Sequence, residues 1–82
     1  MTGFRFAVDV MPRDGILDPQ GKAVEAALPQ LGAESVHGVR VGRRIELTVE
    51  ATDAQAARGV VEKLAADFLA NPLVERWEIE AR

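Results

Sequence analysis

Three stretches of this sequence alternate apolar and polar side chains with a period of two residues. They cover residues 4–11, 45–50 and 73–81. A period of two places neighbouring side chains on opposite faces of an extended chain, so each stretch predicts a strand with one buried face. The residues predicted to face inward are Phe4, Phe6, Val8, Val10, Ile45, Leu47, Val49, Trp77, Ile79 and Ala81.

A first helix is predicted to begin at Asp18-Pro19. An aspartate suits the N-cap, because its carboxylate accepts free backbone N–H groups, and a proline suits the first helical position. An apolar stripe at helical spacing follows, and Pro29 is expected to loosen the last turn because it lacks an N–H group. Gly32 then fits the C-terminal cap. The stripe consists of Val24, Ala27, Leu28 and Leu31.

A second helix is predicted from a capping box in which Thr52 is the N-cap and Gln55 its reciprocal partner. Asn71-Pro72 is expected to end this helix. Its apolar stripe is predicted to pack on the sheet and consists of Ala57, Val60, Val61, Leu64 and Phe68.

A fourth strand is predicted over Val36–Val41, joined to the strand at 45–50 by a tight turn around Gly42-Arg43. Gly42 can supply the positive φ that such a turn needs. The element order is then β-α-β-β-α-β. We therefore expect one α+β domain over residues 1–82: a ferredoxin-like, four-stranded antiparallel sheet with both helices on one face.

The composition excludes several kinds of site. The chain has 82 residues, no cysteine and one histidine, which rules out thiol chemistry and cysteine zinc sites. His37 is interpreted as a strand-edge or loop residue, and most carboxylates as surface groups or helix caps. No catalytic residue and no metal ligand is predicted. The net charge of −3 and the lack of aromatic side chains on the outer sheet face disfavour nucleic-acid binding.

The size of the chain has consequences of its own. A domain of this length buries only about 60% of the surface of its unfolded chain, so oligomerisation is a natural source of stability. The apolar stretches are shorter than a membrane span, and the first residues lack signal-peptide features, so a cytoplasmic location is expected.

Arg40, Arg43 and Arg44 form a basic cluster at the expected turn. Such a cluster is either a solvated turn or a contact for an acidic partner or a phosphate, since guanidinium groups suit both.

Two blocks of the sequence resemble the PurS family. The first is Ile16-Leu17-Asp18-Pro19-Gln20-Gly21, and the second is Val39-Arg40-Val41-Gly42-Arg43. The segment Leu69–Glu75 is similar as well, so the likeness covers nearly the whole chain. Pro29 departs from the family pattern at the end of the first helix.

The resemblance implies a non-catalytic accessory subunit of phosphoribosylformylglycinamidine (FGAM) synthase, a glutamine-dependent, ATP-consuming ligase of purine biosynthesis. It implies a large synthetase subunit and a glutaminase subunit as partners, self-association, and a role in bridging the two partners and helping ammonia pass between them. ATP and magnesium would be used by the large subunit, no cofactor would be bound by this chain, and the isolated chain would be inactive. We expect partner contacts at Asp18, Pro19, Gln20, Gly21, Arg40, Gly42, Arg43 and Arg44.

One alternative from another class stays open at this point. Small-molecule regulatory domains of this topology bind ligands at dimer interfaces, near a glycine-containing loop after the first strand. Gly15 and Gly21 occupy that region of the sequence.

Overall fold

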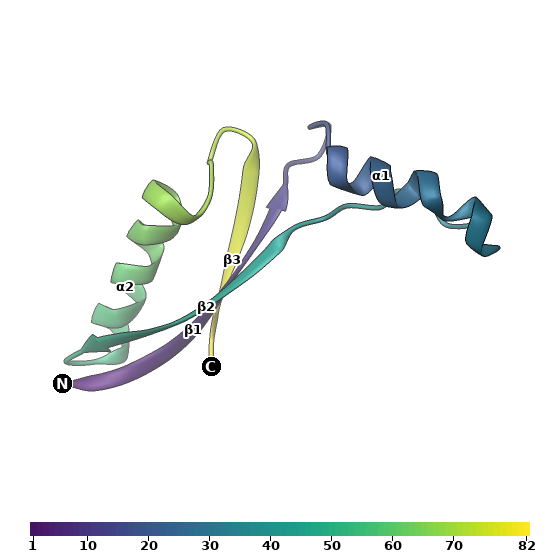
Figure 1. The fold of residues 1–82 in the computed structure, drawn as a ribbon. Coiled ribbons are helices and arrows are strands. Elements are labelled where there is room, and N and C mark those ends of the chain that lie inside the picture. The colour runs from purple at the N-terminus through teal and green to yellow at the C-terminus, as the bar shows by residue number, and fades with distance from the viewer.

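A computed structural model describes all 82 residues, and it divides into a body and an arm (Figure 1). The body consists of three strands and one helix, named β1 (Thr2–Pro12), β2 (Arg43–Ala51), β3 (Glu75–Ala81) and α2 (Ala54–Leu64), the last extended by a π-helical turn at Ala65–Leu69. The arm is residues 13–42 and contains α1 (Pro19–Ala27) and a 3₁₀ turn at Pro29–Leu31. The fold class is therefore α+β, as predicted.

The sheet of the body has the order β2-β1-β3, and both pairings are antiparallel. Phe4, Phe6 and Val8 lie opposite Val49, Leu47 and Ile45 of β2, so the predicted inward residues share one face. Together with α2 that face forms the hydrophobic core, in which Val8, Val10 and Val61 are fully buried. The alternating pattern thus predicted these three strands and their buried face correctly.

The fourth strand does not form within this chain. Residues 36–42 are extended beside α1 and make no ladder with β2. The predicted tight turn at Gly42 is also wrong, because Gly42 has no positive φ and the chain runs straight through it into β2 (Figure 1). A Cβ atom at Gly42 would collide with the Val10 carbonyl and the Met11 sulfur. Gly42 is therefore required by the close approach of β1, and the turn never forms.

The first helix has the predicted N-cap, but its C-cap is Leu28, and Gly32 instead caps the 3₁₀ turn that follows. Asp18 is the N-cap and accepts a hydrogen bond from the Gly21 N–H (3.0 Å), Pro29 starts the 3₁₀ turn, and Gly32 ends it at a φ of 79°. The helix lies away from the sheet, however, so its apolar stripe has no cover: Val24 is 43% exposed and Leu31 77%. The radius of gyration is 16.5 Å, against roughly 12 Å for a compact domain of this length.

The second helix differs from its prediction at both ends. Asp53, not Thr52, is the N-cap and accepts from the Ala56 N–H (2.7 Å). Near the other end the Ala70 N–H bonds to the Ala65 carbonyl, which widens the turn and rotates the residues between them. Phe68 is therefore 79% exposed. Val60, which precedes this turn, is 51% exposed, so the predicted packing of both residues on the sheet is wrong. Ala57, Val61 and Ala65 are the residues that α2 buries against the sheet.

Candidate functional site

The predicted site residues gather mainly where the arm leaves the body, a region we call the junction. Asp18 is buried there and holds two separate segments: it accepts from the Gly21 N–H of α1 and from the Val41 N–H of the extended segment (2.8 Å). The Arg40 Nε lies 3.6 Å from the same carboxylate. These N–H groups, and then the Arg40 charge, hold the pKa of the Asp18 carboxyl below its usual value.

A second carboxylate, which the sequence did not single out, makes the same kind of contact about two turns further along α1. Glu25 accepts from the Val39 N–H (3.2 Å). The alternate residues Val39 and Val41 therefore face α1, because backbone groups of successive residues in an extended chain point to opposite sides. Gly21 stands between these contacts, where a Cβ atom would collide with the Val39 carbonyl. The two glycines of the family-like blocks thus allow close packing of backbone.

The body side of the junction is held by Arg43. Its guanidinium forms a two-pronged hydrogen bond with the Glu75 carboxylate (2.7 and 3.0 Å) and also donates to the Leu69 carbonyl. This pairing raises the pKa of Arg43 and lowers the pKa of Glu75. Glu75 further accepts from the Asn71 N–H (2.7 Å). β2 is thereby fixed to the loop before β3.

A cavity of about 320 Å³ opens between these groups, and its walls come from the arm and the body. Asp18, Pro19, Gln20, Gly42 and Arg43 line it, and Arg40 lines a neighbouring one. The structure thus brings seven of the eight predicted site residues to one region, with Gly21 behind the cavity wall. It also gives Asp18, Gly21, Arg40 and Gly42 internal structural roles.

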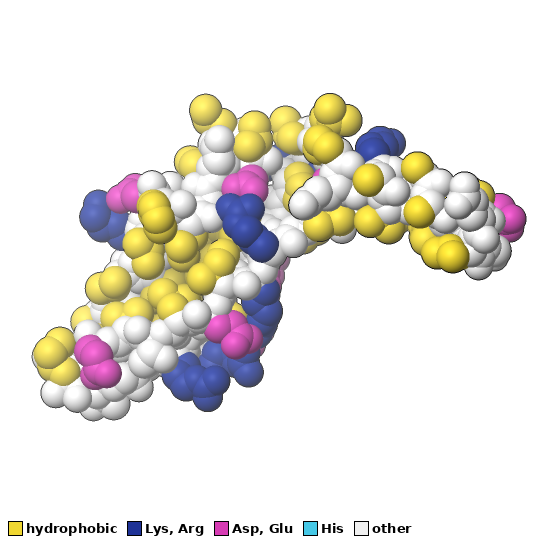
Figure 2. All heavy atoms as spheres, in the orientation of Figure 1, with side chains coloured by type: hydrophobic (Ala, Val, Ile, Leu, Met, Phe, Trp, Pro, Cys, Tyr) yellow, Lys and Arg dark blue, Asp and Glu magenta, His cyan; other side chains and the backbone are white.

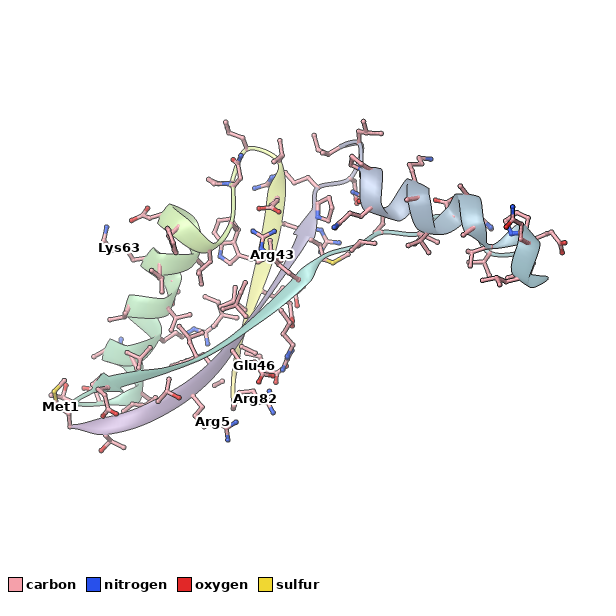
Figure 3. All side chains as sticks on the ribbon, viewed as in Figure 1. Met1, Arg5, Arg43, Glu46, Lys63 and Arg82 are labelled. Carbon is pink, nitrogen blue, oxygen red and sulfur yellow. The ribbon has the colours of Figure 1, made fainter.

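Arg44 is the exception, because it lies on the face of the sheet away from α2. There it bonds to Asp9 (3.0 and 3.1 Å), Glu46 (3.2 Å) and Glu80 (3.3 Å). Arg82 joins the same cluster through Glu46 (2.9 Å), and these arginines hold the pKa of Glu46 low (Figure 3). No basic hairpin tip exists, since Arg43 and Arg44 are successive residues of a strand and point to opposite faces.

The polar contacts of these groups hold the arm and the body together. Asp18, Glu25, Arg43 and Glu75 are each bound to backbone N–H or carbonyl groups or to an opposite charge, and no nucleophile lies beside a base. The structure holds no group of three or more His, Asp or Glu side chains placed to bind a metal ion. No helix is long and apolar enough to cross a membrane.

A second uncovered apolar region, besides the stripe on α1, lies between α2 and β2, and we call it the groove. Arg58 and Glu62 line one flank of α2 with Trp77 and Ile79 of β3, so the opposite flank is turned toward β2. That flank carries Val60, Leu64 and Phe68, and hydrophobic side chains gather between α2 and the sheet (Figure 2). The floor of the groove is formed by the partly exposed Ile45, Leu47 and Val49 of β2, whose outer edge is unpaired.

Comparisons with known proteins agree on one family. Residues 5–82 match the model of the PurS family, described as phosphoribosylformylglycinamidine (FGAM) synthase. The chain is 37% identical to phosphoribosylformylglycinamidine synthase subunit PurS of Thermotoga maritima over 96% of both proteins. It is 42% identical to the subunit of the same name from Mycobacterium leprae, over 92% of this chain and 91% of that protein. A chain in the solved structure of PurLQS from Thermotoga maritima superposes with a TM-score of 0.89 at 35% identity and full coverage of both chains.

Proposed function

Because this chain belongs to the PurS family, and is therefore a PurS subunit of FGAM synthase in purine biosynthesis, we propose that it is the part of that complex that holds the catalytic subunits together. The observation that supports this role most strongly is the arm: 30 of the 82 residues, numbers 13–42, bury only Asp18 and Gly21. The arm has a capped helix, an apolar stripe and hydrogen bonds that fix α1 to residues 39–41, yet no part of this chain covers the stripe. Such a segment suits assembly with another chain. Amidination would take place in a large synthetase subunit that uses ATP and magnesium, with ammonia supplied by a glutaminase subunit.

Self-association follows from the same observation. The arm carries an apolar stripe without cover, and the body carries an apolar groove of matching kind between α2 and β2. Because residues 36–42 run straight into β2, two copies can place these continuous segments side by side and antiparallel. Each arm would then add a strand to the free edge of β2 in the other copy and lay α1 in its groove.

This exchange would restore the arrangement that the sequence predicts. With the arm of a second copy in place, each sheet has four antiparallel strands and two helices on one face, which is the ferredoxin-like order. The proposal thus assigns the predicted four-stranded unit to two chains. The cytoplasmic location stays a prediction from the sequence.

Contacts with the other subunits are proposed at the outer rim of the junction. Pro19, Gln20 and Arg43 are exposed there, with the Arg43 side chain 49% exposed. We expect Arg43→Glu to weaken the assembly of the complex, because it places like charges beside Glu75 and presents an altered surface to the partner. Arg44→Glu on the opposite face is the matched control for loss of a paired arginine.

Reconstitution tests the proposed function. The synthetase and glutaminase subunits are assayed for FGAM formation with glutamine and, separately, with ammonium salt, each with and without this chain. We expect the chain to be needed for the glutamine-dependent rate and to leave the ammonia-dependent rate nearly unchanged. An equal glutamine-dependent rate without the chain would contradict the proposal.

A further inference from the structure

The first residues of β1 have a free edge that the fold leaves open. β3 pairs with β1 only from Phe6 onward, and the last contact of this ladder is the Arg82 N–H donating to the Arg5 carbonyl (2.9 Å). Figure 1 shows β1 continuing well beyond the end of β3. Because backbone groups alternate between the two sides of a strand, Gly3 turns its N–H and carbonyl to the same side as the Arg5 carbonyl. Those groups of Gly3 have no strand beside them.

A groove of about 330 Å³ lies along this open edge. Its apolar surface is formed by Phe4, Phe6, Ala54 and Ala81, with Gln55 at the start of α2. The groove is separate from the one proposed for the arm, because it lies at the β3 side of α2, where Arg58 is turned. It therefore remains open when two copies exchange arms.

The charge of the groove is unusual for this protein. Three arginines line it, Arg5, Arg58 and Arg82, and no carboxylate side chain does, although the chain as a whole has a net charge of −3. Arg58 reaches Glu62 at 3.4 Å and Arg82 pairs with Glu46 and Glu80, whereas Arg5 forms no ion pair. Arg5 and Arg82 lie close together at the end of the sheet (Figure 3).

We propose that this edge is a docking site for an extended, carboxylate-bearing segment of another FGAM synthase subunit, which adds to β1 as a strand. The backbone of Gly3 and the N–H of Arg5 supply the hydrogen bonds of strand addition. Alternate side chains of the added strand point to the two faces of the sheet. On one face they meet Phe4 and Arg58, and on the other they meet Arg5, so acidic side chains find a cation on either face. This inference rests on the proposed function, since it names a surface for one of the proposed partners.

The test measures binding of the intact chain to the purified synthetase and glutaminase subunits separately, by titration calorimetry at low and at high salt. Arg5→Glu and Arg58→Glu place like charge in the groove, and each is expected to weaken binding to one of the two subunits by roughly ten- to a hundredfold, with most of the effect lost at high salt. Arg76→Glu is the matched control, because Arg76 is an exposed arginine of β3 without an ion-pair partner. Its binding is expected to stay at the level of the unmodified chain.

Gly3→Pro tests the strand-addition part. Proline removes the free N–H at an edge position, so the variant should lose affinity. Gly3→Ala is its matched control, because it adds a Cβ atom against the same Thr48 and Glu50 side chains and keeps the N–H. A melting temperature close to that of the unmodified chain verifies folding, and Arg5→Glu serves as the test if Gly3→Pro does not fold.

Unchanged binding of Arg5→Glu and Arg58→Glu to both subunits would overturn the proposal. It would equally be overturned if these variants altered only self-association, because the occupant would then be a second copy. The proposed function would survive either result, since the glutamine-dependent rate tests it independently.

Discussion

The body and the arm of this chain are held together by different forces. In the body, apolar side chains of three strands and α2 are removed from water, and Val8, Val10 and Val61 are fully buried. In the arm, the contacts that fix α1 are carboxylates bound to backbone N–H groups, at Asp18 and Glu25, while the apolar stripe stays exposed. The buried core of the body is thus formed within one chain. The arm is shaped within one chain, and we propose that a second copy buries its apolar side.

The largest effect is expected in the core of the body. Val61→Ala removes two methyl groups from a fully buried site and should lower the free energy of unfolding by about 2–3 kcal/mol. The loss should be the same at every protein concentration, because the site lies within one chain. Urea unfolding at several concentrations measures it, and a loss that depends on concentration would contradict the separation of body and arm.

The arm should show the opposite dependence. Leu28→Ser with Leu31→Ser makes the stripe polar, and we expect the dissociation constant of the dimer to rise by about thirtyfold, which corresponds to roughly 2 kcal/mol. Analytical ultracentrifugation measures it. Leu17→Ser, an equally exposed leucine of the arm outside this stripe, is the control and should leave the dimer intact. Equal weakening by the control would mean that the stripe has no special role.

The attachment of the arm should depend on pH through Asp18. Its pKa is lowered in the folded chain by the N–H groups of Gly21 and Val41, so its contribution is fully present above the ordinary carboxyl pKa and is lost as the pH falls through the lowered value. Amide exchange at Val41 should therefore speed up on acidification below about pH 4 beyond the intrinsic trend.

Asp18→Asn should remove that pH dependence and speed exchange at Val41 at neutral pH as well. Asp14→Asn serves as the control, because the Asp14 side chain is 98% exposed. A pH response at Val41 that persists in Asp18→Asn would show that another group controls the attachment.

The smallest effect is expected on the outer surface of the body. Lys63 and Asp67 form an exposed pair one turn apart (3.0 Å), and such pairs contribute about 0.3 kcal/mol. Lys63→Gln should therefore shift the urea midpoint only slightly, and the dimer should be unaffected. A loss comparable with that of Val61→Ala would mean that the end of α2 carries part of the core stability.

The difference between the two regions also explains which features the sequence could predict. Alternation in the strands and the cap at Asp18 are local signals, and both were correct. The turn at Gly42 was wrong because glycine permits a turn but also permits close approach, and only the position of Val10 and Met11 decides between them. Phe68 was misplaced because a π turn changes the helical period without a mark in the sequence.

The sequence predicted some residues of the candidate site correctly and others not. The two family-like blocks do meet at the junction, and Glu75, the last residue of the family-like segment Leu69–Glu75, lies there as well. Glu25 also completes the junction but gave no signal of its own. The roles of these two glutamates come from tertiary pairing with Val39 and Arg43. Arg44 was grouped with Arg43 by position in the sequence, while a strand separates them onto opposite faces.

The central claim is that the arm of one copy lies in the groove of another, and cross-linking tests it directly. The chain has no cysteine, so single cysteines can be introduced cleanly. Leu28→Cys in the arm of one tagged copy is mixed with Val60→Cys or Phe68→Cys on α2 of a differently tagged copy and oxidised. We predict a disulfide-linked pair carrying both tags, formed more efficiently than with Lys63→Cys on the outer side of α2. If the mixed pair forms no better than with Lys63→Cys, the arm does not occupy the groove of a second copy.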